Sequence, residues 1–67
     1  MKVFAERLKE LRLEKELSQR GLAKLLNLSV QAISQWENES RTPNAEAVAV
    51  IAKFFGVTSD YLLGLED

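Results

Sequence analysis

The stretch LSQRGLAKLLNLSVQAISQWEN, residues 17–38, decides the fold. Its apolar side chains recur at helical spacing in two short runs, which predict one helix from Gln19 to Leu26 and another over residues 30–38. Only three residues separate the two runs. Because so short a turn sets two helices at a steep angle, we predict a helix-turn-helix over about residues 18–38.

Polar residues at the boundaries of these two helices support the prediction. Ser18 and Ser29 each precede one of them, and a serine hydroxyl at such an N-cap accepts a hydrogen bond from a free backbone N–H. Asn27 follows the last apolar residue of the first run and tolerates the left-handed conformation that ends many helices. Both helices therefore have a start signal, and the first also has a stop signal.

The flanking segments predict three further helices. Phe4, Leu8 and Leu11 share one helical face, which predicts a helix from Val3 to Glu16. After the loop at residues 39–43, whose proline rules out a continued helix, two more helices are each expected between a polar N-cap and a terminating glycine: Asn44 to Gly56, and Thr58 to Gly64.

The fourth helix is the most apolar segment of the chain. Its buried face is marked by Val48, Ile51, Ala52 and Phe55. Because Val50 and Phe54 are apolar too, we expect this helix to be buried nearly all round. No segment indicates a strand, a repeat or low complexity. We therefore predict an all-α fold, a compact five-helix domain that takes up residues 1–67.

Composition excludes several classes of protein. The chain contains no cysteine and no histidine, so it has neither disulfides nor the usual metal ligands and general bases. Ser18, Ser29 and Thr58 are explained as helix caps rather than nucleophiles, and the acidic series Glu6, Glu10, Glu14 as an exposed helix face rather than a metal site. We expect a cytoplasmic protein without enzymatic activity, metal or cofactor; its longest apolar run, residues 47–52, is too short to span a membrane.

Charge is distributed unevenly along the chain. The net charge is −1, which by itself argues against a nucleic-acid partner. However, residues 1–36 carry seven basic and four acidic side chains, whereas residues 37–67 carry two basic and six acidic ones. Residues 17–36 contain Arg20 and Lys24 and no acid at all, so the predicted helix-turn-helix is free of negative charge.

The third helix has a polar face with an unusual composition. Ile33 and Trp36 lie three residues apart and are expected in the core, Trp36 as a core residue rather than a stacking platform for bases. The opposite face carries the uncharged polar side chains Gln31, Ser34, Gln35 and Asn38. Such side chains offer both donors and acceptors, as base edges require, and glutamine can pair bidentately with adenine in the major groove. Val30, on the first turn, can contact a thymine methyl group.

An ion pair is expected inside the protein. Arg12 lies eight residues after Phe4 on the inward face of the first helix, so its charge needs a partner. Glu37, at the end of the third helix, is the candidate. We predict a structural ion pair between Arg12 and Glu37.

The positions of several apolar residues match a known family. The chain resembles the phage Cro and repressor type of helix-turn-helix, the xenobiotic-response-element family with its lambda-repressor-like fold, through Leu22-Ala23, Leu26, Leu28, Ile33, Trp36 and the closing Asp60-Tyr61-Leu62-Leu63-Gly64. The resemblance runs from about Phe4 to Gly64. It implies five helices, the third of them in the major groove of DNA, and it also implies the Arg12–Glu37 pair.

This resemblance also implies site residues and partners. Base contacts are implied for Gln19, Val30, Gln31, Ser34 and Gln35, and phosphate contacts for Gln19, Arg20, Lys24, Asn38 and Arg41. The expected function is sequence-specific binding of double-stranded DNA as a transcriptional regulator, with repression favoured. We expect a homodimer on a palindromic operator whose half-sites lie about one helical turn apart.

Three positions depart from the family pattern: Gly21 stands where a helix former is usual, and Asn27 and Glu39 each replace a glycine. Glu39 weakens the phosphate assignment of Asn38 and Arg41, because a carboxylate beside a phosphate-binding loop repels DNA. Gly21 should cost about 1 kcal/mol relative to alanine in a helix interior.

A protein-binding role is the alternative interpretation. An antitoxin of the same fold would neutralise a partner protein, and this interpretation implies an antirepressor or a toxin as partner. Residues 1–67 include no disordered segment of the kind that wraps a toxin, which favours the regulator; that the chain is one domain of a longer protein stays an open alternative. Phe55, Val57 and Leu65 are candidates for a dimer surface, or else for the core.

Overall fold

In the computed structural model, which describes all of residues 1–67, the chain folds into five helices and no strands. These are α1 (Lys2–Glu14), α2 (Gln19–Leu26), α3 (Val30–Glu37), α4 (Ala45–Phe55) and α5 (Ser59–Leu63). The predicted all-α class and five-helix order are confirmed.

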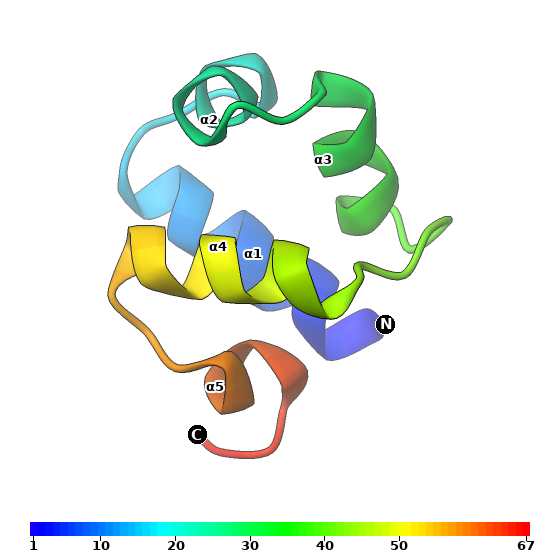
Figure 1. Cartoon of the computed structure of the whole chain (residues 1–67), viewed down its shortest axis with the longest axis vertical. Helices are drawn as coiled ribbons and strands as arrows, with labels where there is room; N and C mark the ends of the chain where they lie inside the picture. The colour runs from blue at the N-terminus through cyan, green and yellow to red at the C-terminus, as the bar shows by residue number, and fades with distance from the viewer.

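The helices surround one core. Figure 1 shows α2 and α3 at one end of the molecule and α5 at the other, with α1 and α4 between them. Accordingly α1 contacts both α3 and α5, while α4 contacts both α2 and α5. The helix-turn-helix is thus supported from behind by the rest of the chain, which leaves the outer side of α3 open.

Every helix contributes a fully buried side chain to the core. The largest of them are Phe4, Leu8, Leu22, Ile33, Ile51 and Leu62. Trp36 is only 4% exposed, and its ring meets that of Phe4 edge-on at a centroid distance of 6.2 Å. The core position predicted for Trp36 is confirmed.

The predicted caps are present at both ends of α2 and at the start of α3. Ser18 Oγ accepts a hydrogen bond from Gly21 N at 2.8 Å, and Ser29 Oγ accepts one from Ala32 N at 3.1 Å. Asn27 ends α2 in the left-handed conformation, with φ 57°. The chain therefore turns over three residues between a capped end of α2 and a capped start of α3.

The first helix ends earlier than predicted. It stops at Glu14, and Glu16, expected to be helical, has a φ of 56°. Glu16 N donates to Leu13 O at 2.9 Å and Leu17 N donates to Arg12 O at 3.1 Å, which together form a Schellman ending. Glutamate rarely takes this conformation, so no stop signal was visible in the sequence.

The end of α3 repeats this geometry. Glu39 takes a φ of 66°, and Ser40 N donates to Gln35 O at 3.0 Å. Asn38, expected as the last helical residue, is instead the cap of the helix. The backbone therefore turns sharply away immediately after α3.

The burial predicted for α4 was too extensive. Ala47, Val48, Ile51 and Ala52 are buried, but Val50 and the adjoining Ala49 are exposed. Neighbouring helices cover only one side of α4, so its outer side faces solvent despite its apolar sequence. Phe54 and Phe55 are half-buried against the core.

Arg7 connects the two ends of the chain. Its guanidinium lies 4.2 Å from the centroid of the Tyr61 ring and donates through Nη1 to the backbone oxygens of Tyr61 and Glu66. A cation over an aromatic ring is attracted to its π face. Arg7 therefore helps to hold α5 against α1, far from the helix-turn-helix.

Candidate nucleic-acid interface

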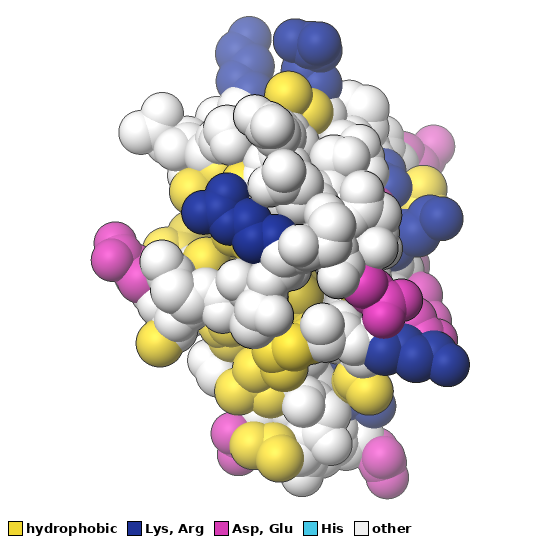
Figure 2. All heavy atoms as spheres, turned by 90° about the vertical axis from the view of Figure 1, so that its right-hand side faces the viewer, with side chains coloured by type: hydrophobic (Ala, Val, Ile, Leu, Met, Phe, Trp, Pro, Cys, Tyr) yellow, Lys and Arg dark blue, Asp and Glu magenta, His cyan; other side chains and the backbone are white.

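The two sides of α3 differ in character. Ala32, Ile33 and Trp36 are buried against the rest of the domain, whereas Gln31 is exposed and its helix neighbours Ser34 and Gln35 are half-buried. Figure 2 views the molecule from the side on which α3 lies and shows mainly white atoms there, which are backbone and side chains that are neither charged nor hydrophobic. The face offers hydrogen-bond donors and acceptors without a formal charge of its own.

Basic side chains flank this face. Arg20 and Lys24 on α2 and Arg41 in the loop after α3 are all exposed. In Figure 2 Lys and Arg side chains lie above this white area and on both sides of it, while most hydrophobic side chains gather below it. A helix that presents neutral polar groups between cations is suited to a partner with an anionic backbone and a polar interior groove.

Val30 and Asn38 are each partly engaged within the protein. Val30 is half-buried and packs against the core, so only part of its side chain faces outward. Asn38 Oδ1 accepts a hydrogen bond from Ser40 N at 2.9 Å. The side-chain amide of Asn38 is therefore left with its N–H donors, which are the groups that a phosphate oxygen accepts from.

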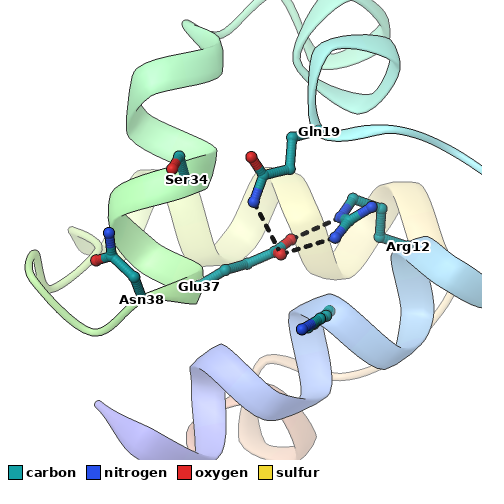
Figure 3. A pocket seen from close by; sticks show the side chains of 6 residues that line it. Arg12, Gln19, Ser34, Glu37 and Asn38 are labelled. Atoms are coloured by element: carbon teal, nitrogen blue, oxygen red, sulfur yellow. Dashed lines mark hydrogen bonds and ion pairs between the residues drawn. The ribbon is translucent and has the colours of Figure 1, made fainter.

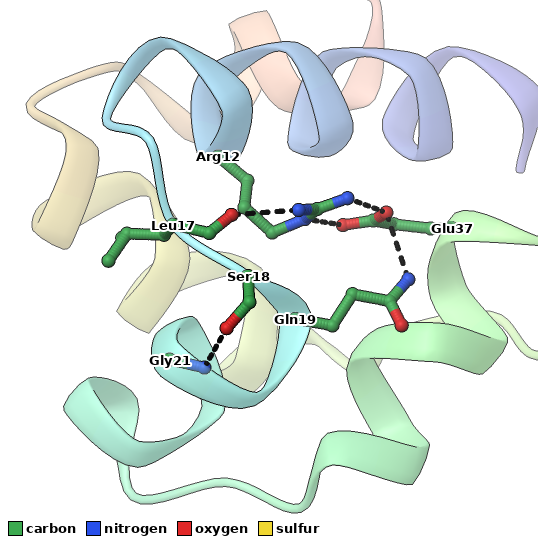
Figure 4. Close-up of polar contacts among 6 residues, drawn as sticks. All are labelled: Arg12, Leu17, Ser18, Gln19, Gly21 and Glu37. Atoms are coloured by element: carbon green, nitrogen blue, oxygen red, sulfur yellow. Dashed lines mark hydrogen bonds and ion pairs between the residues drawn. The ribbon is translucent and has the colours of Figure 1, made fainter.

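The expected ion pair between Arg12 and Glu37 is present. Arg12 Nε donates to Glu37 Oε2 at 2.7 Å, and Arg12 Nη2 donates to Glu37 Oε1 at 2.9 Å. The two side chains are 9% and 5% exposed. Arg12 Nη1 also donates to the backbone oxygen of Leu17 at 2.8 Å, so the pair ties α1, α3 and the segment leading into α2 together (Figure 4).

The ion pair stabilises the charged form of its arginine. The hydrogen bonds to Glu37 raise the pKa of Arg12, burial opposes this, and the Coulomb attraction of the carboxylate adds to the rise. Arginine is already protonated at any physiological pH. Arg12 therefore keeps its positive charge throughout that range.

Gln19 joins this network from the first turn of α2. Gln19 Nε2 donates to Glu37 Oε1 at 3.1 Å (Figure 3). Gln19 lines a surface cleft of about 220 Å³ together with Ser34, Asn38, Lys9 and the ion pair itself. The structure thus brings three of the predicted DNA-contacting residues, from α2, α3 and the end of α3, to one cleft.

Lys9 was missed by the sequence interpretation. It lies on α1, outside the predicted helix-turn-helix, yet it lines the same cleft as Gln19. A signal was available, because Lys9 precedes Arg12 by three residues and such residues share a helix face. It adds a further cation beside the polar face of α3.

All three departures from the family pattern have a structural explanation. Asn27 and Glu39 both occupy positions with positive φ, 57° and 66°, which is where glycine is usual. At Gly21, the Cβ atom of any larger residue would lie 3.1 Å from Ser18 Oγ. Glycine at this position therefore leaves room for the N-cap of α2.

The structure brings no three acidic side chains together in a group that could hold a metal ion. None of the five helices has both the length and the apolar character that crossing a bilayer requires.

The chain is similar in sequence to known helix-turn-helix proteins. Residues 8–62 match the helix-turn-helix family. Over 64 residues the chain is 47% identical to the HTH-type transcriptional activator BcrR of Enterococcus faecalis, with 96% of this chain and 31% of that protein covered. It is 34% identical over 61 residues to repressor protein C2 of Salmonella phage P22, with 91% and 28% covered.

A eukaryotic protein is also similar. The chain is 41% identical over 46 residues to multiprotein-bridging factor 1c of Arabidopsis thaliana, with 69% of this chain and 31% of that protein covered. The chain thus spans less than a third of each of these three relatives.

Proposed function

The chain belongs to the helix-turn-helix family, and from that premise we propose that it binds double-stranded DNA sequence-specifically with α3 in the major groove. The observation that carries the proposal is the outer face of α3, where Gln31, Ser34 and Gln35 project from a helix whose other side is buried. These side chains pair with base edges. The family is one of DNA-binding transcriptional regulators, which supports the same conclusion.

The remaining predicted DNA contacts are of two kinds, to bases and to phosphates. Gln19 and Val30 stand beside the base-reading residues of α3 and extend the reading surface. Arg20 and Lys24, as exposed cations of α2, contact phosphates, as do Arg41 and the free N–H donors of Asn38. Phosphate contacts supply affinity and position, and base contacts supply specificity.

The overall acidity of the chain does not oppose this function. Ten acidic residues are present, but none falls within residues 17–36, which form α2, the turn and most of α3. Glu37, the first acidic residue beyond this segment, is buried against Arg12. The surface that approaches DNA therefore carries less negative charge than the composition suggests.

At the level of the whole protein we propose a transcriptional regulator that acts as a homodimer on a palindromic operator. Two copies with half-sites about one helical turn apart would double the contact area of so small a domain. Leu65 is 72% exposed and is available to such a dimer, whereas Phe55 and Val57 pack partly against the core. A role on DNA agrees with the predicted cytoplasmic location.

Whether the protein represses or activates transcription stays a prediction. One of the similar proteins is named an activator and another a repressor. Repression needs only occupancy of an operator, so it is the simpler outcome for a DNA-binding domain by itself.

A protein-binding role is the second candidate. The name of the similar bridging factor points in this direction, and an apolar groove between α4 and α5 is lined by Pro43, Val48 and Leu63 together with Ala45 and Ser59. This groove contains none of the residues assigned to DNA. Protein binding there would add to DNA binding and would not replace it.

The experiment that tests the proposal is a comparison of two DNA duplexes. A duplex selected by the protein from a random pool and a scrambled duplex of the same composition are titrated by fluorescence anisotropy. We expect the selected duplex to bind about a thousandfold more tightly. Equal affinity for the two duplexes would contradict sequence-specific binding.

A further inference from the structure

Glu37 constrains the orientation of the Gln19 side chain. A carboxylate can only accept hydrogen bonds, so the group of Gln19 that lies 3.1 Å from Glu37 Oε1 must be the NH2 and not the oxygen. The opposite assignment would place two acceptors against each other. The orientation of this amide is therefore fixed by chemistry.

The partner that fixes this orientation is itself held through both of its oxygens. Both oxygens of Glu37 accept hydrogen bonds from Arg12, at 2.7 and 2.9 Å, and the Glu37 side chain is 5% exposed. The carboxylate cannot rotate toward Gln19 or away from it without breaking the ion pair. Gln19 is thus held by a rigid, buried anchor at the base of the cleft.

The orientation determines what Gln19 presents outward. Figure 3 shows Gln19 Oε1 on the side of the amide away from Glu37, toward the cleft that Ser34 and Asn38 also line. A primary amide has two N–H bonds, and only one is needed for Glu37. The outward edge of Gln19 therefore combines an acceptor, Oε1, with one donor.

We propose that Glu37 acts as a positioning residue that makes Gln19 a reader of adenine. The outward edge of Gln19 matches adenine, whose N6 amino group donates and whose N7 accepts in the major groove. A phosphate offers acceptors only, so it could pair with the outward N–H of Gln19 but not with Oε1. This inference rests on the proposed binding of double-stranded DNA, and it assigns to the Arg12–Glu37 pair a role in specificity besides its role in the fold.

The test begins with sequences selected from a random duplex pool by the wild-type protein and by Gln19→Ala. We expect Gln19→Ala to relax the preference for adenine at one position of the site, by about tenfold, while other positions keep their preference. Gln31→Ala serves as the matched control and should relax a different position. A loss of affinity that is equal for all sequences in Gln19→Ala would make Gln19 a phosphate contact and overturn the proposal.

The second step removes the anchor. In Glu37→Gln the new amide can donate to Gln19 Oε1, which allows the Gln19 amide to flip. The double variant Arg12→Met/Glu37→Met replaces the ion pair by apolar side chains of similar volume. For each variant we measure discrimination as the Kd for duplex changed at the base pair assigned to Gln19, divided by the Kd for matched duplex. Partial unfolding affects both Kd values equally and cancels in this ratio.

We expect both anchor variants to lower the discrimination at the base pair assigned to Gln19 by about tenfold. The discrimination at the base pair assigned to Gln31 should stay the same. In a Gln19→Ala background the anchor variants should change neither ratio. Unchanged discrimination at the Gln19 position in both anchor variants would overturn the role of Glu37. Failure of the wild-type protein to select any sequence would instead refute the proposed function itself.

Discussion

Arg12 and Glu37, 25 residues apart in the sequence, form a bidentate ion pair with donor–acceptor distances of 2.7 and 2.9 Å. The pair joins α1, the first helix, to the end of α3. It therefore lies between the core that supports the helix-turn-helix and the surface assigned to DNA. Its energetic role is open to direct measurement.

Removal of one partner of this pair should destabilise the fold strongly. In Arg12→Ala the carboxylate of Glu37 stays buried without its cation, and we expect the free energy of unfolding to fall by about 3 to 5 kcal/mol. Urea unfolding followed by circular dichroism measures the change. The double variant Arg12→Met/Glu37→Met should lose much less, because no unpaired charge stays behind. An unchanged urea midpoint in Arg12→Ala would disprove this role.

The left-handed position after α3 predicts a stabilising substitution. Glu39 has a φ of 66°, which costs a residue with a Cβ atom about 1 to 2 kcal/mol, whereas glycine adopts it freely. After the greater entropy of glycine in the unfolded chain is subtracted, Glu39→Gly should stabilise the protein by up to about 1 kcal/mol. Loss of an acidic side chain beside α3 should also tighten DNA binding.

The matched control for Glu39→Gly is Asn27→Gly, at a φ of 57°. Asparagine tolerates the left-handed conformation, so the gain in thermal stability should be smaller there. A lower melting temperature for Glu39→Gly than for the wild-type protein would contradict the prediction.

The cap of α2 and Gly21 should be coupled. Alanine is favoured over glycine by about 1 kcal/mol within a helix, but its Cβ would lie 3.1 Å from Ser18 Oγ. We expect Gly21→Ala to gain less than this amount in the wild-type protein and the full amount in a Ser18→Ala background. A double-mutant cycle of unfolding free energies measures the difference, and strictly additive effects would show that the two residues do not interact.

Arg20 should contribute to DNA affinity without contributing to specificity. Arg20→Ala is expected to weaken binding to every duplex alike and to reduce the slope of log K against log salt by about 1, because one fewer counterion is released. Lys53→Ala is the control, since Lys53 is an exposed cation on α4, outside the helix-turn-helix. A change in sequence preference in Arg20→Ala would mean that Arg20 reads bases.

The local features of the fold were predictable from the sequence because they depend on neighbouring residues. Serine and asparagine caps, the three-residue turn and the glycines that end α4 and α5 all act within about four residues of their own position. The early end of α1 was not predictable, since Glu16 adopts a conformation that its side chain disfavours. The next residue, Leu17, packs against the core and accepts a hydrogen bond from Arg12, contacts that no local pattern announces.

Some features of the site were likewise predictable from the sequence, and others were not. The polar face of α3 and the Arg12–Glu37 pair followed from helical spacing and from the rule that a buried charge needs a partner. The contact between Gln19 and Glu37 did not, because it links residues 18 apart whose side chains have many other possible neighbours. Likewise, no local pattern indicates that Arg7 reaches the Tyr61 ring, 54 residues away in the chain.

The central claim is that the outer face of α3 reads bases, and selection from a random duplex pool tests it most directly. The wild-type protein, Gln31→Ala and Gln35→Ala are each used to select bound sequences under the same salt conditions. We predict that each variant loses its preference at a distinct position of the site and keeps the rest. If both variants instead bound every sequence more weakly by the same factor, with the preferences unchanged, the face of α3 would not be reading bases.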